Sequence, residues 1–201
     1  MAESTTRRLP RGRHGLSREQ VETDQRIRML LAMAEATADK GFVGTSVADV
    51  LKRAGVSRET FYQHFSDKQD CFLAAFDAAG ELLVAGLAPS LAESGSPLER
   101  FEHAFGAYLD QLSSQPAFAR MFLVEVYAAG AEALERRLAL QQRIVAALAD
   151  LLEVTDEADR FTCELLVAGV GALVTGPLVR GDMAALRSLR APVAAFVRRS
   201  F

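Results

Sequence analysis

A short stretch of the chain gathers side chains that can bind nucleic acid. Its polar residues are Arg58, Glu59, Tyr62 and Gln63, with Thr60 and His64 at their flanks. Such groups hydrogen-bond the edges of bases, touch thymine methyl groups and meet phosphate oxygens. Phe61 and Phe65 have the spacing of a buried helix face, which turns the polar set outward. The pattern predicts a helix that presents a reading surface to DNA.

Two short helices joined by a tight turn must position this surface. A helix of about eight residues precedes Ala54-Gly55-Val56, and a second short helix follows, which is a helix-turn-helix geometry. Gly55 suits the turn because glycine tolerates a positive φ. Many helical corners share such a turn without meeting DNA. The alternative is therefore a helical small-molecule-binding protein or enzyme in which the helix-turn-helix is only structural.

That alternative would be marked by a catalytic cluster, and the sequence offers none. The three histidines lie too far apart for metal-ligand spacing. The chain also lacks a dinucleotide-binding glycine motif, a Walker loop and a Gly-x-Ser-x-Gly elbow. We therefore expect no catalytic residue, no metal site and no cofactor.

The N-terminal residues 1–16 are expected to form a flexible basic arm. The first 18 residues hold five arginines and one acid, whereas the whole chain has a net charge of -3. A basic end on an acidic body predicts a localised contact with a polyanion. Arg11 and Arg13 are the candidates for DNA contact, and a solvated tail is the alternative.

The region that follows the arm resembles the TetR family of transcriptional regulators. The resemblance covers about residues 18–75. It rests on Gly44-Thr45-Ser46-Val47-Ala48-Asp49-Val50, on Arg53-Ala54-Gly55-Val56-Ser57-Arg58-Glu59-Thr60-Phe61-Tyr62-Gln63-His64-Phe65, and on Asp67-Lys68. It implies a three-helix DNA-binding domain followed by a helical domain that binds an effector and dimerises.

The resemblance also implies roles for single residues. Arg58 and Thr60 would read bases in the major groove, whereas Tyr62 and His64 would contact the backbone or a thymine methyl group. Glu59 would accept a hydrogen bond from cytosine N4, form an ion pair with Arg58, or interact favourably with the dipole of its own helix.

Phosphates would be bound at two helix N-termini, by Ser46 with Thr45 and by Lys68. Free N–H groups and the positive end of the helix dipole favour an anion there. The whole predicted DNA-binding set is Thr45, Ser46, Ser57, Arg58, Thr60, Tyr62, Gln63, His64 and Lys68, with Arg11 and Arg13 of the arm. The role of Gln63 stays open.

The remaining sequence predicts further helices. Capping patterns begin at Ser17, Ser46 and Ser96, apolar residues recur at helical spacing, and no segment alternates with period two. About nine helices and no strand predict an all-α protein. We expect an arm at residues 1–16, a helix-turn-helix domain at residues 17–66, and a ligand-binding and dimerisation domain at residues 67–201.

An aromatic cluster suggests where the effector binds. Its members are Phe101, Phe105, Tyr108, Phe118, Phe122 and Tyr127. A buried tyrosine hydroxyl needs a polar partner, so such rings suit a largely apolar pocket better than plain core. The predicted ligand-binding residues are Phe105, Tyr108, Phe122, Glu125 and Tyr127. Ordinary core packing is the alternative for each ring.

The interface between subunits is predicted on the last two long helices. Residues 165–174 are apolar all round, as a helix with protein on every side would be. The predicted interface residues are Val167, Gly171, Val174, Leu189 and Phe196, and an ordinary buried core helix is the alternative. A homodimer would place one helix-turn-helix on each half of a palindrome.

Composition limits the remaining possibilities for the class and the location of the protein. The chain is 50% hydrophobic with two cysteines, too few for a disulfide scaffold. We find no signal peptide, and the longest uncharged apolar run falls short of a membrane span. We therefore expect a cytoplasmic DNA-binding regulator without a membrane partner, a repressor released by a small apolar effector.

Overall fold

The computed structural model describes residues 17–91 and 93–201. Within these residues the chain is helical and contains no strand, which confirms the predicted all-α fold. The first three helices, which we call the head, are α1 (Arg18–Gly44), α2 (Val47–Ala54) and α3 (Arg58–His64). The helices after them form the body: α4 (Lys68–Leu91), α5 (Pro97–Ser114), α6 (Pro116–Leu123), the 3-10 helix η1 (Glu125–Ala128), α7 (Ala131–Leu151), α8 (Glu157–Arg180), α9 (Met183–Ser188) and α10 (Arg190–Ser200).

Local sequence explains where the helices begin. Ser17, Ser46 and Ser96 each accept a hydrogen bond from the third backbone N–H of the helix, and the side chain at that position bonds back to the serine N–H. These reciprocal pairs are capping boxes, at the three predicted positions. Ser57 caps α3 by accepting from the Thr60 N–H.

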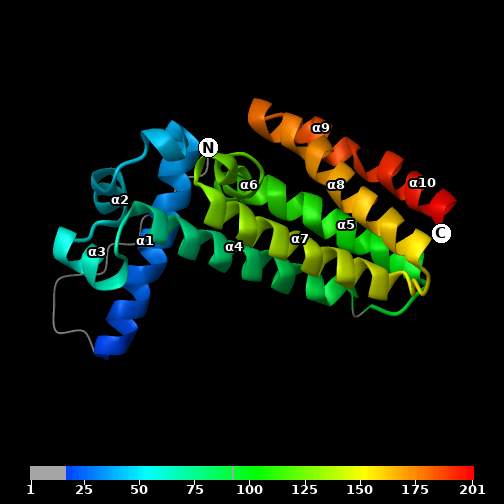
Figure 1. The fold of residues 1–201 in the computed structure, drawn as a ribbon, viewed down its shortest axis with the longest axis horizontal. Coiled ribbons are helices and arrows are strands. Elements are labelled where there is room, and N and C mark those ends of the chain that lie inside the picture. The colour runs from blue at the N-terminus through cyan, green and yellow to red at the C-terminus, as the bar shows by residue number, and fades with distance from the viewer. Residues whose placement is uncertain (1–16, 92) are drawn as a thin grey trace.

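The molecule is elongated, with the head at one end and the body extending from it (Figure 1). α4 leaves the head and runs along the body beside α5 and α7. α8 packs on α7, and α10 packs on α5, so the last helices cover the other side of the body. This arrangement puts four long helices, α4, α5, α7 and α8, around one internal space.

Two helices differ from the sequence expectation. The last helix is divided into α9 and α10 at Leu189. Pro192 explains the break, because proline has no N–H to donate and its ring crowds the carbonyl four residues earlier. Glycine after an apolar helical pattern predicts that the first helix ends at Gly41. In the structure α1 continues to Gly44 across a kink at which Gly41 has φ 72° and ψ 160°.

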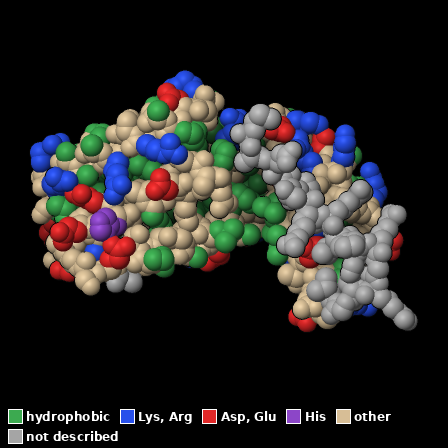
Figure 2. All heavy atoms as spheres, turned by 180° about the vertical axis from the view of Figure 1, so that it is seen from behind, with side chains coloured by type: hydrophobic (Ala, Val, Ile, Leu, Met, Phe, Trp, Pro, Cys, Tyr) green, Lys and Arg blue, Asp and Glu red, His purple; other side chains and the backbone are tan. Residues whose placement is uncertain are grey.

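The head shares its hydrophobic core with the body. One cluster joins Met29 and Phe61 of the head to Phe76 of α4, Met121 of α6 and Val126 of η1. Figure 2 shows hydrophobic side chains gathered at the waist between head and body. A second cluster holds α5, α8, α9 and α10 together. The first cluster contains residues on both sides of residue 66, the predicted end of the helix-turn-helix domain. A shift of α4 or α6 therefore acts directly on the head.

Candidate nucleic-acid interface and ligand cavity

α3 presents the polar face that its sequence predicts. Phe61 and Phe65 are buried, at 0% and 2% exposure, and anchor the helix to the head. On the opposite side Arg58, Tyr62 and Gln63 are exposed. Positions 58 and 62 are one helical turn apart and position 63 is adjacent to 62, so the three side chains share one outer face of α3.

The turn before α3 has the predicted geometry. Gly55 adopts φ 65° and ψ 38°, the left-handed conformation that glycine accepts at little cost. Ser57 is exposed, and its hydroxyl lies 2.9 Å from the Thr60 hydroxyl. Half-buried Thr60 and His64 flank the exposed face, as expected.

Two of the predicted phosphate-binding residues are engaged inside the protein. Thr45 is only 2% exposed, and its hydroxyl donates to the Gly41 carbonyl at 2.8 Å. Lys68 is half-buried and its Nζ donates to the Phe42 carbonyl at 2.9 Å. The structure therefore does not bring Thr45 and Lys68 to the outer surface with Arg58. Ser46 is exposed at the start of α2. Arg11 and Arg13 lie outside the described residues.

A cavity of about 520 Å³, open to the surface, lies between α4, α5, α7 and α8. This volume is in the range of pockets for small organic ligands. Phe105 and Tyr108, both predicted, lie in its wall. The wall consists of Leu83, Val84, Leu87, Phe101, Ala104, Phe105, Tyr108, Arg143, Ile144, Ala146, Ala147, Leu148, Asp150, Leu151, Leu166, Val167 and Val170. Its polar groups are few, as expected for a site that takes an apolar ligand.

The aromatic wall of this cavity is ordered. The rings of Phe101 and Phe105 are parallel, with centroids 5.8 Å apart, and the Tyr108 ring follows at 6.2 Å. Burial raises the pKa of the Tyr108 hydroxyl to about 12. This hydroxyl is therefore protonated at neutral pH, and none of the described residues forms a hydrogen bond with it. It can donate to a ligand in the cavity.

Arg143 stands in the same wall and reaches the protein surface. Its guanidinium lies 2.9 Å from the carboxylate of Glu81, and both side chains are more than half exposed. The guanidinium holds the pKa of Glu81 below its usual range. An exposed pair of this kind is weak, so Arg143 can exchange Glu81 for an anionic group of a ligand.

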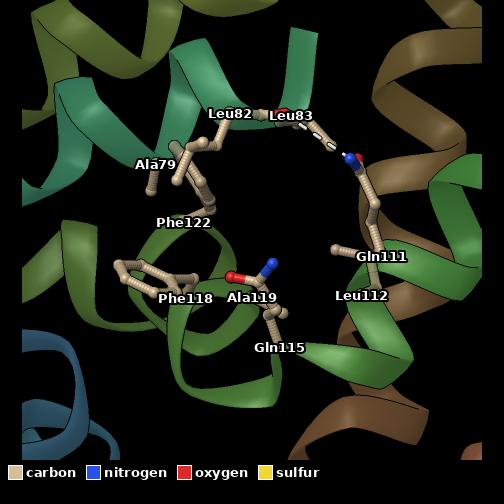
Figure 3. A pocket seen from close by; sticks show the side chains of 9 residues that line it. All are labelled: Ala79, Leu82, Leu83, Gln111, Leu112, Gln115, Phe118, Ala119 and Phe122. Atoms are coloured by element: carbon tan, nitrogen blue, oxygen red, sulfur yellow. Dashed lines mark hydrogen bonds between the residues drawn. The ribbon is translucent and has the colours of Figure 1, made fainter. Parts of the chain in front are cut away.

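A smaller pocket of about 40 Å³ lies next to the cavity, between α4, α5 and α6. The two share Leu83. Phe122 lines this smaller pocket and not the large cavity, and Figure 3 shows it with Phe118 on the α6 side. The Gln115 amide projects into the space, while the Gln111 amide reaches across to the Leu82 carbonyl (Figure 3).

Glu125 and Tyr127 lie outside both pockets, in contrast to the sequence expectation. Tyr127 is 57% exposed, with the Arg137 guanidinium 5.1 Å from its ring centroid. Glu125 is only 7% exposed and accepts a hydrogen bond from the Phe42 N–H at 2.8 Å. The reason is that η1 follows α6 at the waist, so these residues point toward the head and the surface.

α8 carries an apolar face that no described residue covers. Phe161, Leu165 and Leu173 are each more than half exposed, and Phe196 of α10 is 42% exposed. The predicted interface residues fall into two groups, one on the open side and one that faces inward. Phe196 and Gly171 lie on the open side, since a Cβ at Gly171 would meet nothing within 4 Å.

The other predicted interface residues face inward. Val174 is fully buried in the second cluster, and Val167 lines the cavity. Leu189 is half-buried against the second cluster. The side of α8 that is free to meet another chain is therefore the one with Leu165 and Leu173.

Length and composition alone make α4 and α8 long and apolar enough to cross a membrane, which is also true of many core helices. In this fold both helices pack along the body. Over residues 17–91 and 93–201, no group of three or more His, Cys, Asp or Glu side chains is placed to hold a metal ion. Cys71 and Cys163 are both buried, and burial raises the pKa of each thiol, that of Cys71 to about 12.

Sequence reasoning missed Gly41 and Phe42 as functional candidates. Gly41 adopts a backbone conformation that is almost exclusive to glycine. Phe42 makes hydrogen bonds through both sides of its backbone, to Glu125 and to Lys68. The only signal in the sequence was a glycine inside a helical pattern.

Gly41→Ala is expected to lower the free energy of unfolding by about 1–3 kcal/mol, because alanine is strained at this φ and ψ. Its Cβ would also lie 3.4 Å from the Glu125 carboxylate. Gly44→Ala is the matched control, since Gly44 lacks a positive φ, and it is expected to change stability by no more than about 1 kcal/mol. Urea denaturation of both variants makes the comparison. Equal stability for the two would show that the kink is not strained.

Three comparisons with known proteins bear on these features. Residues 30–75 match the family described as bacterial regulatory proteins, tetR family. The transcriptional activator FasR of Mycolicibacterium smegmatis is 28% identical over 109 residues, which are 54% of this chain and 50% of FasR. The match thus spans half the length of this curated relative.

Solved structures share the fold over most of the chain. FadR of Bacillus subtilis, in complex with stearoyl-CoA, has a TM-score of 0.75 at 17% identity, covering 87% of this chain and 98% of its own. The fatty acid degradation regulator FadR of Bacillus halodurans has a TM-score of 0.74 at 18% identity, covering 84% and 95%. A TetR-like regulator of Rhodococcus sp. RHA1 has a TM-score of 0.70 at 23% identity, covering 89% and 96%.

Proposed function

We propose that this chain, in which residues 30–75 match the tetR family of bacterial regulatory proteins, is a sequence-specific DNA-binding transcriptional regulator. The observation that carries the proposal is α3, which is anchored by two buried phenylalanines and turns Arg58, Tyr62 and Gln63 outward. In the major groove, arginine pairs with guanine O6 and N7, and glutamine pairs with adenine N6 and N7. We assign base reading to this face and phosphate contact to Ser46.

The functional unit in this proposal is a homodimer. Leu165 and Leu173 are exposed on α8 and Phe196 is exposed on α10, and a two-fold axis would bury both copies of these side chains. A single short helix reads too few base pairs for a specific site. Two heads related by a two-fold axis would read a palindrome.

The effector proposed for the large cavity has a long apolar chain and one polar end. Support comes from the apolar wall, from the Tyr108 hydroxyl as the hydrogen-bond donor, and from Arg143 at the rim. The stearoyl-CoA bound to FadR of Bacillus subtilis makes a fatty acyl group the first probe. We propose that the bound effector lowers the affinity for DNA, so that the regulator acts as a repressor.

The DNA-binding proposal is tested with DNA from upstream of the chain's own gene, since such regulators often control neighbouring genes. Fluorescence anisotropy at physiological salt is expected to give a dissociation constant at least about a thousandfold lower than for random DNA of equal length. A selection from random duplexes is expected to enrich a palindrome. Equal affinity for all sequences would contradict sequence-specific recognition.

Tyr108→Phe is expected to weaken binding of stearoyl-CoA by about 2–12-fold, because one hydrogen bond contributes about 0.5–1.5 kcal/mol. The substitution keeps the ring, so the volume of the cavity is unchanged. Tyr127→Phe removes a hydroxyl outside the cavity and serves as the control. Calorimetry measures the affinity of both variants for stearoyl-CoA. Equal affinity for the two variants would place the polar end of the ligand away from Tyr108.

A further inference from the structure

The backbone of Phe42 is held from two sides by charged groups of the body. Its N–H donates to Oε2 of Glu125 at 2.8 Å, and its carbonyl accepts from Nζ of Lys68 at 2.9 Å. The Lys68 ammonium also lies 4.3 Å from the centroid of the Phe42 ring. Phe42 itself is 8% exposed, and its ring packs edge-on against Phe72 of α4 at 4.9 Å. We call this arrangement the Phe42 clamp.

The kink at Gly41 makes the clamp possible. A regular helix uses each N–H for a bond four residues back, whereas the non-helical turn at Gly41 directs the Phe42 N–H toward η1. The Glu125 carboxylate comes within 3.4 Å of the position a Cβ would take at Gly41. Glycine therefore serves two needs at once, a positive φ and a close approach.

One arm of the clamp belongs to a helix that lines the pockets, and the other lies next to such a helix. Lys68 is the first residue of α4, which contributes Leu83, Val84 and Leu87 to the wall of the large cavity. Glu125 begins η1, directly after α6, whose Phe118 and Phe122 line the smaller pocket. A displacement of either helix therefore reaches the same residue of the head, Phe42, through its N–H or through its carbonyl.

The cost of burying Glu125 argues that it does more than stabilise the fold. Its side chain is 9% exposed, and the charged group nearest to it, Arg120 Nη2, is 3.5 Å away. Arg120 Nε is itself buried without a hydrogen-bond partner. A buried carboxylate with an imperfect partner contributes little net stability, yet it is costly to leave unpaired. Breaking the bond to the Phe42 N–H would therefore leave this carboxylate without its backbone donor.

We propose that Glu125 is a positioning residue that couples occupancy of the cavity to the orientation of the head. The proposal rests on the proposed function, because it assigns the route by which the effector acts on DNA binding. In the arrangement described here Glu125 holds Phe42. In the second arrangement α6 shifts along α1, the bond breaks, and α2 and α3 turn with α1. The effector acts by binding one of these arrangements more tightly than the other.

The first test needs no ligand. Spin labels at Lys52→Cys on α2 and Gln142→Cys on α7, both exposed sites, report the distance from head to body. Glu125→Ala is expected to broaden the distance distribution, whereas Glu125→Gln keeps an acceptor for the Phe42 N–H and is expected to restore one narrow peak. Glu135→Ala, an exposed acid of α7, is the control. A narrow, unshifted peak for Glu125→Ala would overturn the proposal.

The second test measures coupling, with stearoyl-CoA as the probe and operator DNA as the second ligand. In the unaltered chain the probe is expected to change the dissociation constant for DNA by about 5–150-fold, the usual range for allosteric coupling. In Glu125→Ala the probe is expected to bind as before, while the change for DNA falls to within about twofold of none. Glu135→Ala is expected to behave as the unaltered chain.

The outcomes separate the two proposals. If Glu125→Ala couples as strongly as the unaltered chain, the positioning role of Glu125 is wrong and the effector proposal stands. If the unaltered chain does not bind stearoyl-CoA, the effector proposal fails, and the spin-label distances still decide the role of Glu125. If Glu125→Ala does not fold, Glu125→Gln takes its place in the coupling measurement. Coupling within about threefold of that of the unaltered chain would support the hydrogen bond as the coupling element. A loss of coupling in Glu125→Gln, which keeps the acceptor, would overturn the proposal.

Discussion

Glutamate in place of Leu165 is expected to leave the chain monomeric at micromolar concentration and to weaken operator binding at least about 100-fold. Leu165 is 55% exposed on the open apolar face of α8. At a two-fold interface the substitution would bury two unpaired carboxylates, each costing about 3–5 kcal/mol, and every 1.4 kcal/mol is a tenfold change in affinity. A head without a partner reads only half of the operator.

Sedimentation velocity and operator anisotropy measure these two effects. Leu138→Glu is a closely matched control, because Leu138 is also 55% exposed but lies on α7. It is expected to leave both the dimer and the DNA affinity unchanged. If Leu138→Glu gave monomers and Leu165→Glu did not, the interface would be on α7. If the unaltered chain were monomeric on its operator, the dimer proposal would be wrong.

Alanine in place of Arg58 is expected to abolish most of the discrimination between operator and random DNA. A bidentate pair between arginine and guanine contributes about 1–3 kcal/mol, which corresponds to about 5–150-fold per half-site. Arg58 is the first residue of α3 and is exposed, and none of the described acids forms an ion pair with it. Its guanidinium is therefore free for a base without breaking a contact within the head.

The readout is the ratio of affinities for operator and random DNA, not the affinity alone. Lys52→Ala is the control, because Lys52 is an exposed cation of α2. It is expected to weaken binding to both DNAs by the same factor, as the loss of a phosphate contact does. A ratio that falls equally in the two variants would contradict the assignment of base reading to Arg58.

The head was predictable from sequence because short-range rules determine it. Serine caps, a left-handed glycine at position 55 and two phenylalanines four residues apart act within a few positions of one another. Each rule operates on neighbouring residues, so the exposed face of α3 follows from the local pattern. Thr45 is the exception, since its hydroxyl turns inward to a carbonyl at the Gly41 kink.

The periodicity of apolar residues could not predict which face of α8 is open. Residues 165–174 are apolar on all sides, so the sequence contains no polar stripe that marks the outer face. Packing on α7 and in the second cluster decides the rotation of the helix, and the second cluster buries Val174 while Leu165 and Leu173 stay open. The wall that α8 gives to the cavity was missed for the same reason.

The role of Glu125 depends on a contact between residues 83 positions apart. A single acidic residue after an aromatic helix fits a ligand site, a surface or a buried hydrogen bond equally well. Only the fold, which brings η1 against the kink of α1, distinguishes these possibilities. Five of the six aromatic residues likewise divide between two pockets, because the rings of α5 line the large cavity and those of α6 line the smaller pocket.

The place of Lys68 bears on how strongly salt opposes DNA binding. Each phosphate that a cation neutralises releases counterions, and the logarithmic dependence of affinity on salt steepens by about 0.9 for each one. An ammonium that stays on the Phe42 carbonyl adds nothing to this slope. If the Lys68 ammonium instead binds a phosphate, the slope becomes steeper, and the hydrogen bond between the start of α4 and the end of α1 is lost. In that second case, ionic strength would act on the contact between α1 and α4 as well as on the attraction to DNA.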